Sequence, residues 1–130
     1  MSQGKTNKTK GSNGEREYAK LFRELGYPLC KTARQGSRLM DDAGIDLINI
    51  PFNVQIKVGK HTGMNASKVL AIIKERLPMA LPPTDPIHKF PSVLIHKKQV
   101  GIGNKRGEFD TIVSMSLDDF IKIIKNDKSK

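Results

Sequence analysis

The feature that most constrains the fold is residues 44–60, GIDLINIPFNVQIKVGK, because it contains two β-type runs close together. Residues 45–50 are rich in isoleucine and leucine, and residues 54–58 alternate valine or isoleucine with Gln55 and Lys57. β-Branched residues and period-two alternation are typical of strands, and proline and asparagine at 51–53 are typical of a turn. The segment therefore predicts a β-hairpin over roughly 45–58.

Polar residues interrupt this hairpin in a pattern that raises a functional question. A turn centred between Ile50 and Pro51 would place Asp46 opposite Gln55, and directly opposed residues share a face of the sheet. Gln55 and Lys57 share a face because strand side chains alternate. The three side chains are then predicted to lie together. Taken singly, Asp46 could be a strand-end acid and Lys57 a solvent-facing strand residue.

Such a cluster has recognisable chemistry. Carboxylate and amide oxygens are ligands for Mg²⁺, which takes one or two protein oxygens together with waters and phosphate. A neighbouring lysine can hold a water molecule or help to deprotonate it. We therefore interpret Asp46, Gln55 and Lys57 as a candidate site for metal-assisted hydrolysis, with Mn²⁺ as a possible substitute for Mg²⁺.

A helix is predicted upstream of the hairpin. Ser12 can cap its N-terminus and Glu15 stands at capping-box spacing, while Gly26 is suited to ending it. Glu15 can be a capping residue, a site residue or both; Glu17 is the next candidate acid on this helix. The apolar stripe of the helix is formed by Tyr18, Leu21, Phe22 and Leu25.

The complete order of predicted elements is α β β β α β β α, a mixed α/β domain with a central sheet flanked by helices. The segments outside the hairpin and first helix are a strand at 27–34, a polar loop at 35–43, a helix after Asn65 or Ser67 that stops at Pro78, an irregular proline-rich connection at 78–91, strands at 91–96 and 109–115, and a helix at 116–125 capped by Ser116.

With 130 residues, the chain is long enough for one domain with a modest core. Residues 1–11 are predicted to be a disordered basic tail, residues 12–125 the single domain, and residues 126–130 a basic C-terminal tail.

Charge indicates the kind of partner. The formal net charge is +10, which favours a polyanionic partner, most often nucleic acid, although basic charge can serve solubility alone. No apolar run reaches the ~20 residues of a membrane span and no long amphipathic basic helix is evident, so no membrane partner is expected. Cys30 is the single cysteine, which excludes an internal disulfide and favours a reducing, cytoplasmic location.

Two segments of the sequence resemble those of a known family. GID, eight residues and then QIK, preceded by the helix segment GSNGEREYAKLFRELGYP, resemble the core of the PD-(D/E)XK nuclease superfamily. The opening helix is similar to that of archaeal-type Holliday junction resolvases and their phage relatives. The resemblance spans approximately 11–120 and implies a restriction-endonuclease-like core.

The resemblance also implies roles for individual residues. Asp46 would be the central metal carboxylate, Lys57 the catalytic lysine and Glu15 the acid supplied by the helix. The backbone carbonyl of Ile56 would complete the metal shell. Gln55 departs from the family, since an aspartate or glutamate usually occupies its position. A neutral amide there is expected to weaken metal binding and to favour one metal over two.

Several basic and polar residues near the predicted site are candidate contacts to nucleic-acid phosphates, with a solvated surface as the alternative reading. They are Arg34, Ser37, Arg38, Lys60, His61, Lys97, Lys98, Lys105 and Arg106. His88 and His96 show no zinc-ligand spacing with Cys30.

The sequence thus leads to the hypothesis of a Mg²⁺-dependent DNA endonuclease, most like a Holliday junction resolvase acting on a four-way junction as a homodimer. Two alternatives stay open: a non-catalytic DNA-binding protein that keeps the nuclease fold, and a nicking or restriction-like endonuclease without junction preference.

Overall fold

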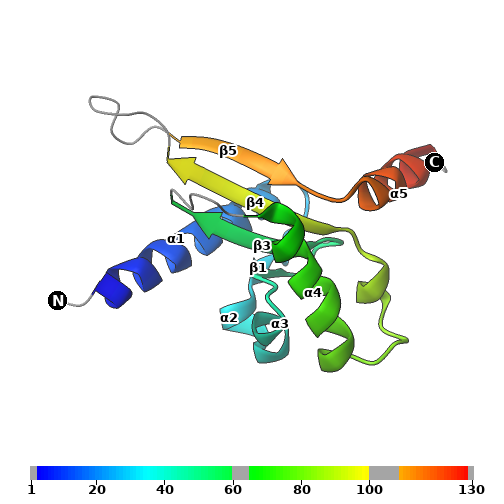
Figure 1. Cartoon of the computed structure of the whole chain (residues 1–130), viewed down its shortest axis with the longest axis horizontal. Helices are drawn as coiled ribbons and strands as arrows, with labels where there is room; N and C mark the ends of the chain where they lie inside the picture. The colour runs from blue at the N-terminus through cyan, green and yellow to red at the C-terminus, as the bar shows by residue number, and fades with distance from the viewer. Residues whose placement is uncertain (1–2, 60–64, 100–108, 129–130) are drawn as a thin grey trace.

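The structure is a computed structural model that describes residues 3–59, 65–99 and 109–128 (Figure 1). Its elements are α1 (Gln3–Glu24), β1 (Lys31–Thr32), α2 (Ala33–Gly36), α3 (Arg38–Asp42), β2 (Leu47–Ile48), β3 (Asn53–Val58), α4 (Ala66–Ala80), the 3₁₀ helix η1 (Pro86–Lys89), β4 (Ser92–Gln99), β5 (Phe109–Ser114) and α5 (Leu117–Lys128). With the short helices set aside, this order is the predicted α β β β α β β α, and the mixed α/β class is confirmed.

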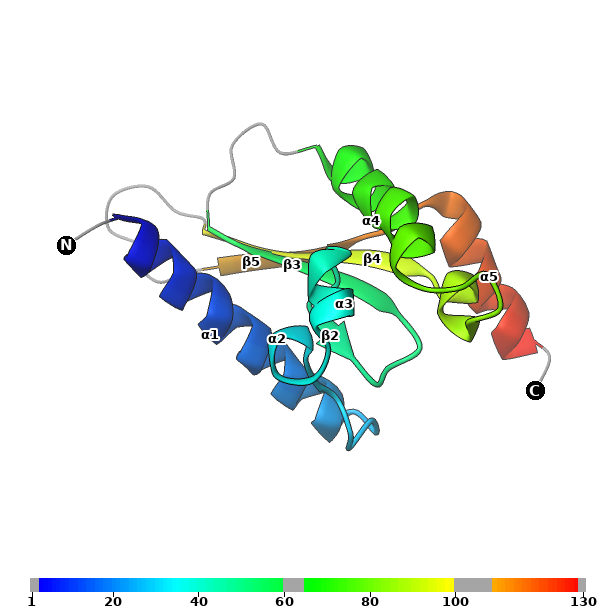
Figure 2. The same ribbon diagram turned by 90° about the horizontal axis from the view of Figure 1, so that it is seen from below.

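A three-stranded mixed sheet in the order β3-β4-β5 forms the centre of the molecule. β3 and β4 are parallel, whereas β4 and β5 are antiparallel. Parallel neighbours need a crossover connection, and α4 provides it between β3 and β4. Figure 2 shows α1 and α4 on opposite faces of this sheet. A separate antiparallel pair joins β1 to β2.

Two apolar clusters form the core, one that includes α1 and one that includes α4. On the α1 side, Tyr18 and Ala19 pack with Val54 and Ile56 of β3. On the other side, Ile73 and Leu77 of α4 pack with Ala43, Ile45 and Ile87. These two layers hold β3 between α1 and α4, and β3 carries most of the predicted site.

The predicted hairpin over 45–58 is wrong as a regular two-stranded ladder. β2 pairs with β1, and β3 pairs with β4, so the two runs belong to different sheets. The runs still meet where the Asp46 N–H donates to the Val54 carbonyl, 2.7 Å away, which is one residue out of the predicted register. The connection at 49–52 consists of bends and includes Asn49 in the left-handed region at φ 67°.

The ends of the domain also differ from the prediction. α1 begins at Gln3 and not at Ser12, so residues 3–11 are helical, and α5 continues to Lys128, so residues 126–128 are helical as well. Extending an existing helix is inexpensive, because each added residue gains a hydrogen bond without a new nucleation step.

Local capping explains further departures between residues 27 and 43. The predicted strand shrinks to Lys31–Thr32, because the Thr32 side chain caps α2 by accepting from the Gln35 N–H. The predicted loop at 35–43 instead holds the end of α2 and all of α3, which Ser37 caps by accepting from the Met40 N–H. Serine and threonine favour such caps.

Proline has a weaker effect on α4 than predicted. The helix continues past Pro78 to Ala80, since a proline in the last turn removes few intrahelical bonds, and the Leu81 N–H still donates to the Leu77 carbonyl. Within the described ranges, no helix combines the length and apolar character needed to cross a membrane.

Candidate active site

Two buried carboxylates, Glu15 from α1 and Asp46 from the segment before β2, come together beside β3. Glu15 is 5% exposed and Asp46 is 8% exposed, which is unusual for acids. They lie close enough for each carboxyl to influence the pKa of the other. Residues separated by 31 positions in the sequence thus form one acidic pair, as the sequence hypothesis expected.

Gly14 explains how α1 approaches β3 closely enough to deliver Glu15. A Cβ atom added at Gly14 would lie 2.5 Å from Cγ2 of Val58 and 3.9 Å from Cγ2 of Ile56. Any larger residue would force α1 away from the sheet, because a valine methyl group has little freedom to move. The close helix–strand contact therefore sets the height of Glu15 above β3.

Asp46 is fixed to the free edge of β3 by two backbone contacts. Its N–H donates to the Val54 carbonyl, and its Oδ2 accepts from the Ile56 N–H at 2.6 Å. Because the N–H and C=O of one strand residue point to the same side, the Ile56 carbonyl faces this edge too. The prediction that the Ile56 carbonyl is a metal ligand requires this direction.

Burial raises the pKa of Asp46 to about 7. The Ile56 N–H and the Lys57 ammonium oppose this rise, while the neighbouring Glu15 adds to it. Burial also raises the pKa of Glu15, against the opposing effect of the Arg34 guanidinium. Two carboxylates that share a confined space hold one proton between them near neutral pH. The pKa of Asp46 is raised to about 7, so this carboxyl is the one that holds a proton near neutral pH.

Arg34 of α2 contacts the acidic pair directly. Its Nε lies 3.0 Å from Oε2 of Glu15. The same Oε2 is buried and forms no properly directed hydrogen bond with any described residue, so the Arg34 contact is a charge pair only. Arg34 was predicted to contact phosphate; its half-exposed side chain now links the acidic pair to the surface.

Lys57 and Gln55 occupy different parts of the site. The Lys57 ammonium is close enough to Asp46 to lower the pKa of that carboxyl. The Gln55 amide points toward Gly44, since a Cβ built at Gly44 would lie 3.2 Å from Gln55 Oε1. The cross-strand placement of Asp46 opposite Gln55 is therefore wrong, because Asp46 bonds to Val54 and Ile56 instead.

The other predicted phosphate contacts are scattered. Ser37 caps α3, and Arg38 beside it is exposed. Lys97 pairs with Glu17 at 2.9 Å, and Lys98 is exposed. The remaining candidates, Lys60, His61, Lys105 and Arg106, lie outside the described residues.

The donors present fit a single Mg²⁺ or Mn²⁺ ion. In the part of the chain that is described, three or more His, Cys, Asp or Glu side chains do not converge on one point. Mg²⁺ nevertheless needs only one or two carboxylates, with waters and substrate phosphate filling the other positions. The buried Oε2 of Glu15, which lacks a hydrogen bond among the described residues, and the raised pKa of Asp46 mark a pair of acids whose charge a cation would neutralise.

Sequence reasoning missed two residues that shape this site. Gly14 is needed for close packing, and its signal is a glycine inside a helix next to a site acid. Asp41 of α3 raises the pKa of Glu15 by its negative charge. It lies in the segment predicted as a loop, so only the fold brings its charge near α1.

Comparison of the chain with models of protein families, with curated proteins and with solved structures gave no match to any of them. The nuclease resemblance therefore rests on the quoted motifs alone, and the fold is described by its own topology.

Proposed function

We propose that the protein is a metal-dependent DNA endonuclease that hydrolyses phosphodiester bonds. The observation that supports this most is the buried Glu15–Asp46 pair at the free edge of β3, with the Ile56 backbone and the Lys57 ammonium beside it. Buried acids with raised pKa values and a specific charge partner are typical of functional sites.

In this proposal Glu15, Asp46 and the Ile56 carbonyl would hold one Mg²⁺ or Mn²⁺ ion, which would neutralise charge at the phosphate and acidify a water. Asp46 would bind the ion in its deprotonated form. Lys57 positions the attacking water beside Asp46. The water oxygen forms the new bond to phosphorus and loses a proton to solvent, while the bond to the leaving oxygen breaks and that oxygen acquires a proton from solvent. Arg34 lies at the exposed side of the pair, where it can contact a second phosphate oxygen.

By the resemblance described above, the proposed substrate is branched DNA, a four-way junction, and the proposed active form is a homodimer that cuts paired strands. The net charge of +10 is suited to a polyanionic substrate.

Cleavage of labelled DNA with Mg²⁺ or Mn²⁺ tests the proposal. We expect Asp46→Ala and Lys57→Ala to reduce cleavage by at least about 100-fold while DNA binding persists, since both residues act on the reaction and not on DNA affinity. The matched controls are Asp42→Ala and Lys68→Ala, which change exposed residues on α3 and α4. Cleavage that survives Asp46→Ala would disprove the assigned site.

A comparison of DNA substrates and a variant at Gln55 distinguish the proposal from its two alternatives. Four-way junction, flap and linear duplex are compared; equal cutting of all three indicates an endonuclease without junction preference. Absence of cutting with every metal, together with salt-sensitive binding, indicates the non-catalytic protein. In that case Gln55→Glu restores the usual carboxylate and tests whether the neutral amide alone prevents metal binding.

A further inference from the structure

The terminal helix α5 turns its apolar side away from the molecule. Four large apolar side chains at 117, 120, 121 and 124 form a stripe along it. Leu117 is 70% exposed, Phe120 49%, Ile121 37% and Ile124 40%. We call these four residues the α5 stripe. A surface helix of an isolated globular protein buries this kind of stripe against its own core.

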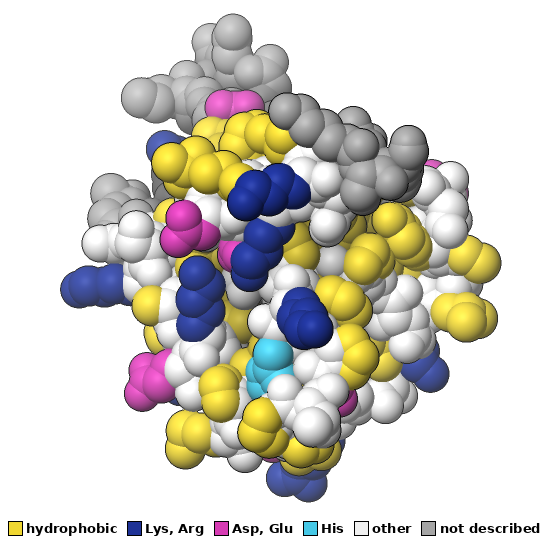
Figure 3. Space-filling view, turned by 90° about the vertical axis from the view of Figure 1, so that its right-hand side faces the viewer, with side chains coloured by type: hydrophobic (Ala, Val, Ile, Leu, Met, Phe, Trp, Pro, Cys, Tyr) yellow, Lys and Arg dark blue, Asp and Glu magenta, His cyan; other side chains and the backbone are white. Residues whose placement is uncertain are grey.

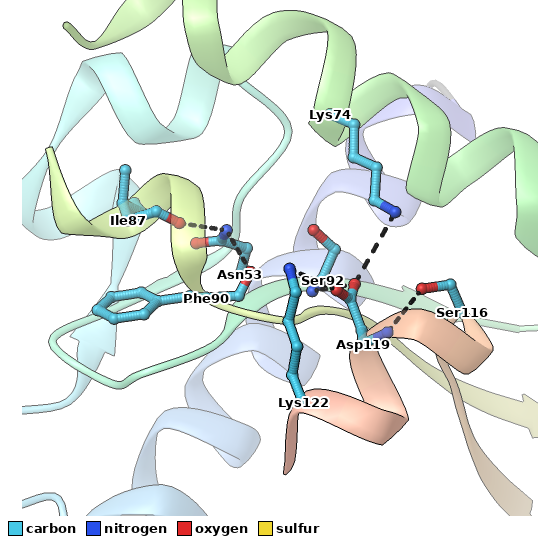
Figure 4. Close-up of polar contacts among 8 residues, drawn as sticks. All are labelled: Asn53, Lys74, Ile87, Phe90, Ser92, Ser116, Asp119 and Lys122. Carbon is cyan, nitrogen blue, oxygen red and sulfur yellow. Dashed lines mark hydrogen bonds and ion pairs between the residues drawn. The ribbon is translucent and has the colours of Figure 1, made fainter. Parts of the chain in front are cut away.

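The opposite, polar side of α5 attaches the helix to the sheet (Figure 4). Asp119 is 2% exposed, and its Oδ2 accepts from the Ser92 N–H of β4 at 3.0 Å. Its Oδ1 lies 3.3 Å from Nζ of Lys122, and Lys74 of α4 approaches Oδ2 at 4.0 Å. The Asp119 N–H donates to Ser116 Oγ at 3.1 Å. The orientation of α5 is therefore fixed by polar contacts, which keep the stripe outward.

The place of α5 makes this stripe accessible. Figure 1 shows α5 extending beyond the end of the sheet, away from α1. Figure 3 views the molecule from that side, where exposed hydrophobic side chains lie beside lysine, arginine and acidic side chains. Apolar side chains rimmed by charges are typical of a protein–protein contact.

The order of charged residues along α5 is complementary to that of a second, antiparallel copy of the same helix. Asp118 near its start and Lys125 near its end are both exposed. They are separated by two helical turns, so they lie on the same flank of the α5 stripe. When two such helices pack antiparallel about a two-fold axis, that flank of one copy meets the same flank of the other. Asp118 then lies beside Lys125 of the second copy, twice in each dimer; a parallel pair separates these flanks.

We propose that two copies of this chain associate through the α5 stripe, with their α5 helices antiparallel. A symmetric contact of this kind buries the α5 stripe of both copies and pairs Asp118 with Lys125 through one shared surface. The biological purpose of this dimer rests on the proposed function, in which two strands are cut. Its physical basis lies in α5 alone, so the dimer and the nuclease activity can be tested separately.

Sedimentation velocity of the full chain without DNA, over the micromolar range, tests the proposal. We expect a concentration-dependent dimer, because a contact made by one helix from each copy is small and gives modest affinity. Phe120→Asp is expected to raise the dimer dissociation constant by about tenfold or more. Its matched control is Ile72→Asp, which changes a 41% exposed apolar residue on α4 and leaves association unchanged. Circular dichroism confirms that each variant is folded.

Charge reversal tests the antiparallel order. Asp118→Lys and Lys125→Asp each place like charges together, so each variant alone should associate several-fold more weakly. An equimolar mixture of the two should form heterodimers of nearly wild-type affinity, since every contact again joins opposite charges. Glu75→Lys and Lys68→Asp on α4 are the matched reversals, at positions that are also exposed.

Three outcomes would overturn the inference. The first is a monomer throughout the concentration range. The second is a dimer that is insensitive to Phe120→Asp or to the charge reversals, which assigns association to another surface or order. The third is binding of the monomer to vesicles of anionic phospholipid that depends on Phe120, which identifies the α5 stripe as a lipid-binding face.

Discussion

At the scale of single residues, Asp46 has both a structural role, through its hydrogen bonds to β3, and a role in the proposed chemistry. Its backbone N–H and one carboxylate oxygen bind β3, so its position is set by hydrogen bonds before any metal arrives. Burial beside Glu15 then makes the charged form of Asp46 costly. In the proposed function, the acidic pair would exchange this proton for a cation, which is the behaviour expected of a preorganised metal site.

The raised pKa of Asp46 makes folding stability depend on pH. The folded pKa of about 7 exceeds the ordinary aspartate value of 3.8, so the folded state binds this proton more tightly. The resulting stabilisation is present in full below about pH 4 and is lost as pH rises through about 7. Without metal, we expect the free energy of unfolding to fall between about pH 4 and pH 7, by on the order of 2–4 kcal/mol for this group.

Urea denaturation at several pH values measures this dependence. Asp46→Asn should flatten the pH profile in this window, while Asp42→Asn on the exposed side of α3 should not. Added Mg²⁺ should recover stability at the alkaline end, since it binds the folded acidic pair. A wild-type profile as flat as that of Asp46→Asn would contradict the assignment.

At the scale of elements, the position of α1 over β3 depends on Gly14, and that of α5 on β4 depends on Asp119. Both residues act by contact across elements: Gly14 through the absence of a side chain, and Asp119 through a buried carboxylate. Neither role follows from helix propensity, which disfavours glycine and aspartate within helices.

Gly14→Ala should destabilise the protein by about 1–3 kcal/mol through overpacking against Val58. Helix propensity alone predicts the opposite sign, because alanine is the better helix former. Asn13→Ala, at an exposed neighbour in α1, serves as the control and should be neutral or stabilising. Thermal unfolding measures both variants; a stabilised Gly14→Ala would show that α1 does not approach β3 this closely.

Asp119→Ala should cost about 1–3 kcal/mol, because it leaves the Ser92 N–H without its acceptor. Burial by itself would raise the pKa of Asp119, but the Ser92 N–H and the nearby lysines Lys122 and Lys74 hold it below its usual value. The associated stability is present above the unfolded pKa of about 4 and is lost as pH falls through the folded value.

Denaturation of Asp119→Ala and Asp118→Ala compares the buried aspartate with its exposed neighbour on the same helix. Only the Asp119 variant should lose about 1–3 kcal/mol of unfolding free energy. Equal effects in the two variants would mean that general charge at the start of α5, and not the Ser92 contact, supplies the stabilisation.

At the scale of the whole molecule, a high net positive charge accompanies a small acidic site. The net charge of +10 includes the acids of the site, so the rest of the chain is more basic still. In the proposed function this positive charge would attract a polyanion, while the acidic pair would bind a cation.

DNA binding should therefore weaken steeply with salt. With Asp46→Asn to suppress cleavage, the logarithm of the binding constant should fall linearly with the logarithm of the salt concentration, at a slope of about −0.9 per phosphate contacted in duplex DNA. Reversing Lys98 to glutamate, at an exposed position on β4, should make the slope shallower if that residue contacts phosphate. Binding that is indifferent to salt would exclude a phosphate-dominated contact.

The sequence by itself determined the local preferences of this chain: the main element order, the apolar faces, and the candidate acids Glu15 and Asp46. These depend on residues close together in the chain, where side-chain period and capping chemistry act directly. Tertiary structure alone decided the partners. β3 pairs with β4 in preference to β2, Asp46 bonds to Ile56 and not opposite Gln55, and Asp119 is a buried anchor. Strand partners and burial arise from contacts between distant segments, which no local pattern encodes.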